Sequence, residues 1–274
     1  MSGSRFNPVS THATRQEKKV LVSPVHFFFT FTLMFFVTSV VFGFPLTTED
    51  TGTIPQGRSK IELNIERGEV QKDDAKEVSV NNEVALVYGL ADHLNGFINL
   101  PYRDITTQKT GGTGNTSSGL GDARFGLKWR YIEQGGFSMC LKGGVILPTG
   151  DKAKNLGNGQ AGYDINVIAS YEVASLDFHF NLGYALFPGL LEQREGIVNI
   201  STSVAMQIMA SWKALADIGI SENKNINSLG APAYVGVGLS HELKQKMFLE
   251  LGIKHVFTAV DMDNTGLIGF GWIL

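Results

Sequence analysis

The sequence predicts an all-β fold: a transmembrane antiparallel up-and-down β-barrel of about 12 strands, preceded by a cleavable signal peptide. Three observations predict it. Apolar and polar residues alternate with a period of two through most of the chain after residue 57, as in strands with two unlike faces. Long polar connections alternate with tight turns. Trp and Tyr residues gather on the apolar face near the strand ends, where membrane interfaces would lie.

The first 43 residues have the composition of an export signal. Arg15, Lys18 and Lys19 precede an apolar run over residues 25–42, and Val41 and Gly43 precede a cleavage site before residue 44. An uncleaved transmembrane helix is the alternative, because the run is long for a signal peptide. We expect residues 1–43 to be a signal peptide that directs export through the inner membrane to the bacterial outer membrane.

Composition narrows the class of protein. Of 274 residues, 43% are apolar and 18% are charged, and 32 are glycines, which suits sheets with many turns. Cys140 is the single cysteine, so an internal disulfide is excluded and we expect a packed or lumen-facing thiol. Residues 1–43 hold four Lys or Arg and one Glu, which leaves 19 basic and 25 acidic residues in the remainder. A nucleic acid partner is therefore not expected.

Residues 119–136 show the alternation most clearly. Phe125, Leu127, Trp129 and Tyr131 form one face and charged residues form the other, before the chain turns at a Gly-Gly pair. In a soluble sheet the apolar face would meet a core, whereas in a membrane barrel it would meet lipid. The same alternation predicts strands near residues 58–66, 78–90, 94–102, 137–148, 163–171, 176–184, 198–206, 212–220, 235–239, 247–257 and 268–274.

The connections predict how the chain is organised around residues 58–274, the expected barrel. Six long polar loops, among them residues 68–77 and 104–118, alternate with five tight turns. An up-and-down barrel with both termini in the periplasm requires this asymmetry, and a sandwich does not. Residues 44–57 are polar, acidic and rich in Thr, and lack periodicity. As a hypothesis, this segment folds into the lumen from the periplasmic side as a plug.

The aromatic residues favour a membrane barrel over a soluble β-sandwich. In a sandwich the rings would spread through the core, but here they flank an aliphatic band as two girdles would. The girdle candidates at the short-turn edge are Tyr88, Trp129, Tyr131, Tyr171, Trp212 and Trp272, and those at the long-loop edge are Tyr102, Tyr163, Tyr184 and Phe257.

Charged residues on the opposite face are the candidate pore lining. Two readings stay open: a network of mutually compensating ion pairs that fills a narrow barrel, and a pore lining whose mixed charges screen solutes. The candidates are Glu62, Glu83, Asp122, Arg124, Lys128, Arg130, Lys142, Asp164, Lys213, Asp217, Glu250 and Lys254.

No catalytic motif stands out. A nucleophile elbow, a Walker loop and the His-Glu-x-x-His spacing are all missing from the sequence, so we expect no enzyme, catalytic residue, cofactor or metal site. One alternative is a phospholipase- or protease-like barrel enzyme, for which His241 and His255 lie on the apolar face. Another is a structural barrel that conducts nothing.

Four stretches resemble the outer-membrane transporter family of the meta-pathway of phenol degradation. They are residues 48–53 (TEDTGT), 119–130 with GLGD and GLKWR, 147–151 (LPTGD), and 157–163 with GNG and GY. The resemblance implies an outer-membrane channel or facilitated-diffusion transporter for small, often aromatic or hydrophobic, molecules. Its expected partners are outer-membrane lipid, a small-molecule solute and the barrel insertion machinery, although such barrels commonly end in Phe and this chain ends in Leu274.

Overall fold

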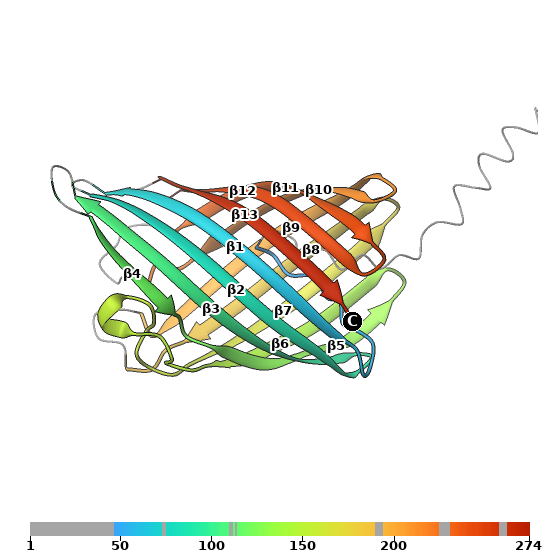
Figure 1. The fold of residues 1–274 in the computed structure, drawn as a ribbon. Helices are drawn as coiled ribbons and strands as arrows, with labels where there is room; N and C mark the ends of the chain where they lie inside the picture. Colours follow the sequence, from blue (N-terminus) through green and yellow to red (C-terminus); the bar gives the residue numbers. More distant parts are fainter. Residues whose placement is uncertain are drawn as a thin grey trace, which may run out of the picture. The chain divides into compact units, whose positions relative to one another are not determined.

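The computed structural model describes residues 47–72, 75–109, 112, 114–189, 194–224, 231–257 and 262–274. The expected signal peptide, residues 1–43, lies outside this part of the chain. The strands and one short 3-10 helix account for most of the described residues (Figure 1). They are β1 (Ser59–Lys72), β2 (Ala75–Ala91), β3 (Leu94–Lys109), β4 (Asn115–Leu120), β5 (Arg124–Gln134), β6 (Phe137–Ile146), η1 (Lys152–Lys154), β7 (Gly162–Val173), β8 (Leu176–Leu186), β9 (Gly196–Met209), β10 (Trp212–Ser221), β11 (Ala233–Lys244), β12 (Met247–Phe257) and β13 (Met262–Ile273).

The strands form a single antiparallel sheet that closes on itself. Strands that follow one another in sequence pair, except that β5 pairs with β3 and not with β4. The pairing of β1 with β13, from Lys60–Ile273 to Val70–Asp263, completes the ring. Closure gives every described strand except β4 hydrogen-bond partners on both sides, and β4 pairs with β3 alone. The predicted up-and-down barrel is confirmed.

Two of the thirteen segments share one position in the ring. The first half of β3 pairs with β5 and its second half pairs with β4. The break falls opposite Pro101, which has no N–H to donate to the ladder and instead accepts a bond from Gly121 N at 2.9 Å. Counting β4 and β5 as one interrupted strand gives the expected twelve positions in the described barrel.

Two expected loops prove to be strand. Residues 68–77 belong mostly to β1 and β2, and residues 104–118 belong mostly to β3 and β4. Polarity misled the prediction, because a strand needs backbone pairing and not apolar side chains once it has left the bilayer. Thr106 and Thr116 illustrate this, since their hydroxyls meet across the two strands at 3.1 Å. The hairpins therefore continue past the apolar band.

The tight turns were predicted correctly at the other end of the barrel. Five two-residue connections join β2–β3, β5–β6, β7–β8, β9–β10 and β11–β12. In the second of them, Gly135 and Gly136 have φ of 59° and 81°, the left-handed values that a two-residue hairpin turn needs. A Cβ at residue 136 would lie 2.6 Å from the carbonyl oxygen of Glu172, so glycine is required there.

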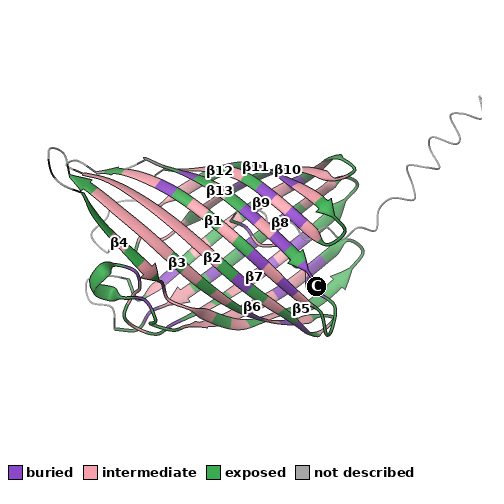
Figure 2. Ribbon diagram, viewed as in Figure 1, coloured by how far each residue is buried: buried purple, intermediate pink, exposed green. Residues whose placement is uncertain are grey.

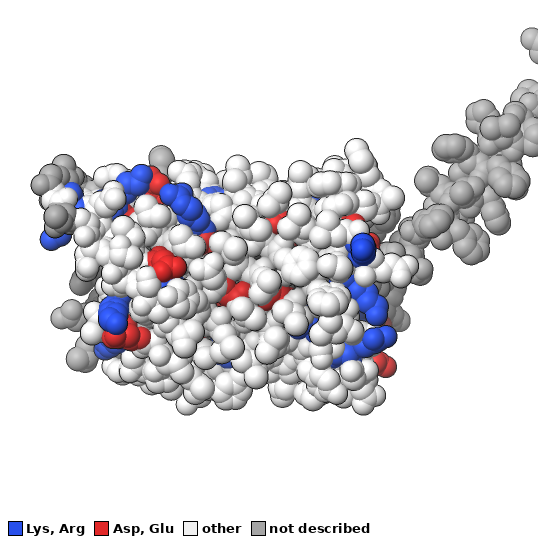
Figure 3. Space-filling model, viewed as in Figure 1, with Lys and Arg blue, Asp and Glu red and all other residues white. Residues whose placement is uncertain are grey.

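Burial is inverted relative to a soluble protein. Exposed and less exposed residues alternate over part of most strands, whereas the far part of β2 is uniformly intermediate (Figure 2). The exposed set is aliphatic and aromatic, whereas Glu62, Asn181, Asp217, Ser240 and Glu250 on the inner face are buried. On the face shown in Figure 3, Lys and Arg concentrate near the two ends, and the middle is mostly uncharged apart from a few Asp or Glu side chains. An apolar exterior around a polar interior is the arrangement of a barrel that spans a lipid bilayer.

We expect the outer face to tolerate charge only beyond the apolar band. Val167 lies midway between the exposed Tyr163 and Tyr171 on β7, so V167R should destabilise the barrel by about 2–4 kcal/mol. T106R, in the polar extension of β3, is the matched control and should cost no more than about 1 kcal/mol. Denaturant unfolding in lipid vesicles measures both. Equal costs would contradict the assignment of the band to lipid.

Candidate functional site in the barrel lumen

The chain that precedes β1 lies among the inward-facing side chains of the barrel. We call residues 47–57 the lumenal segment. Its Thr48, Thr51, Thr53 and Ile54 are buried, at 0–4% exposure, although the segment belongs to no strand. Its backbone polar groups must therefore find partners among the side chains of the wall.

Asp217 on β10 holds the start of the lumenal segment. Its carboxylate accepts hydrogen bonds from the backbone N–H groups of Thr47 and Thr48, at 2.8 and 2.9 Å, and from the Thr48 hydroxyl at 2.7 Å. The Tyr234 hydroxyl on β11 donates a fourth at 3.1 Å. A buried carboxylate is stable only when its oxygens are satisfied, and here the segment supplies three of these four donors.

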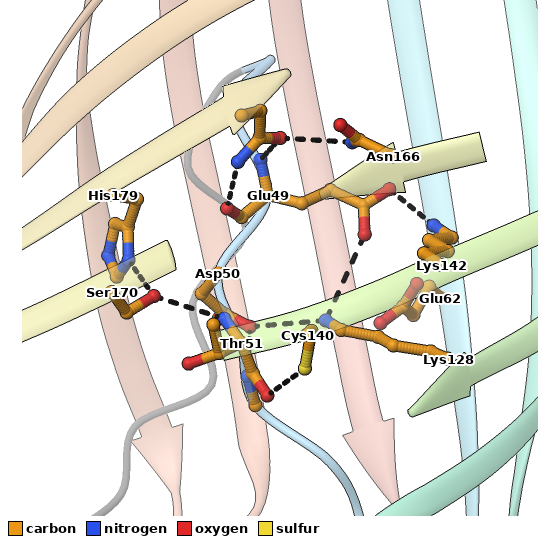
Figure 4. Close-up of polar contacts among 12 residues, drawn as sticks. Glu49, Asp50, Thr51, Glu62, Lys128, Cys140, Lys142, Asn166, Ser170 and His179 are labelled. Atoms are coloured by element: carbon orange, nitrogen blue, oxygen red, sulfur yellow. Dashed lines mark hydrogen bonds and ion pairs between the residues drawn. The ribbon is translucent and has the colours of Figure 1, made fainter. Parts of the chain in front are cut away.

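Uncharged side chains hold the middle of the segment (Figure 4). Asn181 on β8 accepts from Glu49 N at 2.8 Å and donates to the Glu49 carbonyl at 2.7 Å, as a neighbouring strand would. Ser170 on β7 accepts from Thr51 N at 3.2 Å, and the Cys140 thiol on β6 donates to the Thr51 carbonyl at 3.0 Å. Together with Asp217, these contacts fasten the segment to the β6–β10 side of the ring.

Charge pairs hold the same stretch to β5 and β6. The Glu49 carboxylate contacts the Lys142 ammonium and lies 3.8 Å from that of Lys128, and Asp50 lies 3.4 Å from Lys128. Burial alone would raise the pKa of Glu49 above its ordinary 4.5, but Lys142 and Lys128 outweigh it and the pKa is lowered. Burial also favours the neutral form of Asp50, but the charge of Lys128 outweighs it, so the pKa of Asp50 is lowered from its ordinary 3.8. Both carboxylates are therefore ionised at neutral pH.

The structure places the twelve pore-lining candidates in three groups. Lys128, Lys142 and Asp217 contact the lumenal segment. Eight lie elsewhere on the strands. Five of them form ion pairs: Arg124 with Asp164, Lys213 with Asp177, Glu62 with Lys60, and Arg130 with Glu133. Glu83 accepts a hydrogen bond from Asn99, Lys254 lies over the Tyr234 ring, and Glu250 is buried. Whether these residues line an open pore stays a prediction.

Asp122, the twelfth candidate, belongs to a different structure. It lies in the break between β4 and β5, and its carboxylate accepts hydrogen bonds from Gly150 N at 3.0 Å and Asn158 N at 2.7 Å in the loop after β6. A Cβ at Gly157 would lie 2.2 Å from Asp122 Oδ1, so the loop can approach this closely only as glycine. Asp122 thus fixes the loop over residues 147–161.

Nine of the ten aromatic girdle candidates are exposed, and one is half-buried. Tyr88, Tyr102, Trp129, Tyr131, Tyr163, Tyr171, Tyr184, Phe257 and Trp272 are exposed on the outer face. Trp212 is half-buried, because its indole stacks on the His241 ring with centroids 4.2 Å apart. That these rings form membrane girdles stays a prediction.

Small polar residues were missed as site residues. Ser138, Ser170 and Asn181 hold the segment without charge, and their only signal in the sequence was an inward position on an alternating strand. His179 completes this chain of contacts, since its Nδ1 lies 2.8 Å from the Ser170 hydroxyl oxygen. The backbone N–H of Thr51 donates to the Ser170 hydroxyl of this Ser–His pair, so Ser170 holds the backbone of the segment.

Other site types find no support in the described residues. His241 Nδ1 contacts the Ser211 carbonyl at 3.0 Å, and His255 Nδ1 contacts the Asn264 amide oxygen at 2.8 Å. Within the described ranges, no group of three or more His, Cys, Asp or Glu could hold a metal ion. The same part of the chain contains no helix with the length and apolarity needed to cross a bilayer.

Comparisons with known proteins place the fold. The model of a family described as "Putative MetA-pathway of phenol degradation" matches residues 43–265, which confirms the resemblance noted from the sequence. No curated protein sequence matches the chain.

Two solved structures illustrate the similarity. The COG4313 outer membrane channel from Pseudomonas putida F1 is 13% identical with a TM-score of 0.70, covering 82% of this chain and 98% of that one. The β domain of the Bordetella autotransporter BrkA is 12% identical with a TM-score of 0.53, covering 79% and 99%. These likenesses show the fold of outer-membrane barrels.

Acid should loosen the lumenal segment. The pKa values of Glu49 and Asp50 are lower in the folded protein than their ordinary values of 4.5 and 3.8. Their ion pairs therefore stabilise the folded protein fully above these ordinary values, and this stabilisation is lost as the pH falls through the lowered pKa values. The Cys140 thiol, buried under Thr51, reports release. The measurement is the rate at which Cys140 is labelled by a dipyridyl disulfide, a reagent that still reacts in acid. Divided by the rate for unfolded protein at the same pH, this labelling rate should rise below about pH 4.

The double variant E49Q/D50N is the control for this titration. It should label faster than the native protein at neutral pH and respond less to acid, with Asp217 and His179 still present in both proteins. An identical acid response in the two proteins would refute the role of these carboxylates.

Removing the Asp122 carboxylate should free the loop after β6. D122A loses both loop contacts, and each hydrogen bond to a carboxylate contributes on the order of 1.5–3 kcal/mol. We expect faster tryptic cleavage after Lys152 and Lys154, with D122N intermediate because one acceptor oxygen remains. Unchanged cleavage in D122A would show that the loop is held by other contacts.

Proposed function

This chain belongs to the MetA-pathway of phenol degradation family, and on that premise we propose that it is an outer-membrane channel for facilitated diffusion of small molecules. The observation that carries the proposal is the charged, hydrogen-bonded interior of a closed ring whose exterior is apolar. A barrel built only as a membrane anchor has no need of so many inward charges. The family description makes phenol-like aromatic compounds the first solutes to test.

The lumenal segment is the plug of this channel. It crosses the interior and occupies positions at which a solute would meet Lys128 and Lys142. Residues 47–51 of the segment contact side chains of the wall through hydrogen bonds and ion pairs, not through a strand ladder, so this part can leave the wall without breaking the sheet. Residues 1–43 act as the export signal, and assembly in the outer membrane uses the insertion machinery.

Similar structures support a channel over an enzyme. The COG4313 protein is described as an outer membrane channel, and it aligns over 98% of its length. In the described residues, Nδ1 of each histidine on the apolar face contacts an oxygen of a carbonyl or an amide and not a serine hydroxyl. Transport needs no cofactor or energy source here, since solutes follow their own gradient.

Deletion of residues 47–53 should increase single-channel conductance several-fold in planar bilayers. The deletion removes the atoms that occupy the lumen and leaves the ladder of every strand intact. A variant in which the same seven positions are Gly and Ser keeps the length of the segment and loses its side-chain contacts. Its conductance should flicker between the native level and the level of the deletion. Unchanged conductance in the deletion would refute the plug.

Liposome swelling in sugars and in phenol-like solutes tests the channel itself. A pore predicts swelling that depends on the solute, and the deletion should swell faster than the native protein. Absence of swelling in both proteins would favour the structural barrel instead.

A further inference from the structure

We propose that Lys128 and Lys142 form a binding station for small organic carboxylates, and that the Glu49 side chain occupies it as an internal stand-in. The inference deepens the proposed channel by naming the chemical class of its solute, and it rests on that function. Both ammonium groups reach the carboxylate of Glu49 in the lumen (Figure 4).

The register of the sheet requires an anion at this place. Lys128 of β5 and Lys142 of β6 are directly opposite each other in the ladder. Like charges on facing positions of adjacent strands repel, and these two side chains are only 13% and 12% exposed. A negative charge between them turns the repulsion into two attractions.

Other cations of the lumen have partners on the strands themselves. Arg124 forms a two-pronged contact with Asp164, Lys213 lies 2.6 Å from Asp177, and Lys60 lies 2.6 Å from Glu62. The ion pairs of Lys128 and Lys142 go instead to Glu49 and Asp50 of the lumenal segment. Their counter-charge is therefore carried by a part of the chain outside the sheet.

The Glu49 carboxylate can be exchanged without detaching the segment. Its side chain is 35% exposed, so a solute in the lumen can approach it. Its backbone is held separately, by the two hydrogen bonds to Asn181. A carboxylate from solution can therefore take the place of this one side chain while the segment stays anchored.

The present occupant indicates an organic carboxylate, because the Glu49 carboxylate reaches the two lysines at the end of a short hydrocarbon chain. The Phe97 ring lies beside the station, 4.7 Å from the Lys142 ammonium and 4.7 Å from the Arg124 guanidinium. The ring is only 6% exposed and both cations lie over it, so it helps to hold the Lys142 and Arg124 side chains in place.

Calorimetric titration of the detergent-solubilised protein tests the inference. Propionate, which matches the Glu49 side chain beyond Cα, is the probe, and propionamide is its neutral isostere. E49Q removes the competing negative charge and leaves a neutral side chain that propionate can displace, so propionate should bind E49Q about tenfold more tightly than the native protein, and propionamide should bind neither. Equal heats from propionate and propionamide in E49Q would overturn the proposal.

Lysine variants in the E49Q background locate the site. E49Q/K142M should bind propionate about tenfold more weakly than E49Q, because one charge-assisted contact is lost. E49Q/K213M is the matched control, since Lys213 is 14% exposed and paired with Asp177, and its affinity should equal that of E49Q. If E49Q/K142M does not fold, E49Q/K128M takes its place. Equal weakening by K142M and K213M would place the site elsewhere.

Conductance separates this inference from the proposed function. Propionate binding with no current or swelling in any variant would refute the channel and leave the binding station. Solute passage without propionate binding to E49Q would refute the station and leave the channel.

Discussion

The contact between the carboxylates of the lumenal segment and two opposed lysines is the interaction on which the interior depends. Closing a sheet into a ring turns one face inward, and in a barrel surrounded by lipid that face is the polar one. Lys128 and Lys142 face each other across adjacent strands, where they repel. Glu49 and Asp50 resolve this conflict, and in doing so they place a piece of chain across the lumen.

Two kinds of contact divide the work of holding the segment. Asp217, Asn181 and Ser170 bind its backbone, so they fix its path whatever its side chains are. The ion pairs bind its side chains, so they depend on pH and on competing anions. In the channel that we propose, this division lets the segment respond to a solute at one point while it remains anchored at others.

Much of the architecture could be predicted because lipid selects strongly on one face. Alternation located the strands and the tight turns, and nine of ten aromatic candidates are exposed. Beyond the bilayer that selection ends, which is why the polar parts of β3 and β4 looked like a loop. Asp122 looked like pore lining because the break opposite Pro101 is invisible to a pattern of period two. Trp212 is less exposed than the other aromatic candidates because its indole stacks on His241 of the neighbouring strand, a contact that a pattern along one strand does not reveal.

The partners of residues 47–51 could not be predicted from the sequence for a related reason, because they lie 78 to 170 positions away in the chain. The most direct test of its position is a cross-link. Thr51→Cys combined with Ser138→Cys puts two thiols where the native hydroxyl oxygens lie 2.5 Å apart. Mild oxidation of the folded variant in membranes should join the two thiols in a disulfide, detected by mass after proteolysis. If no disulfide forms and the introduced thiols react freely with a water-soluble thiol reagent, the account is contradicted.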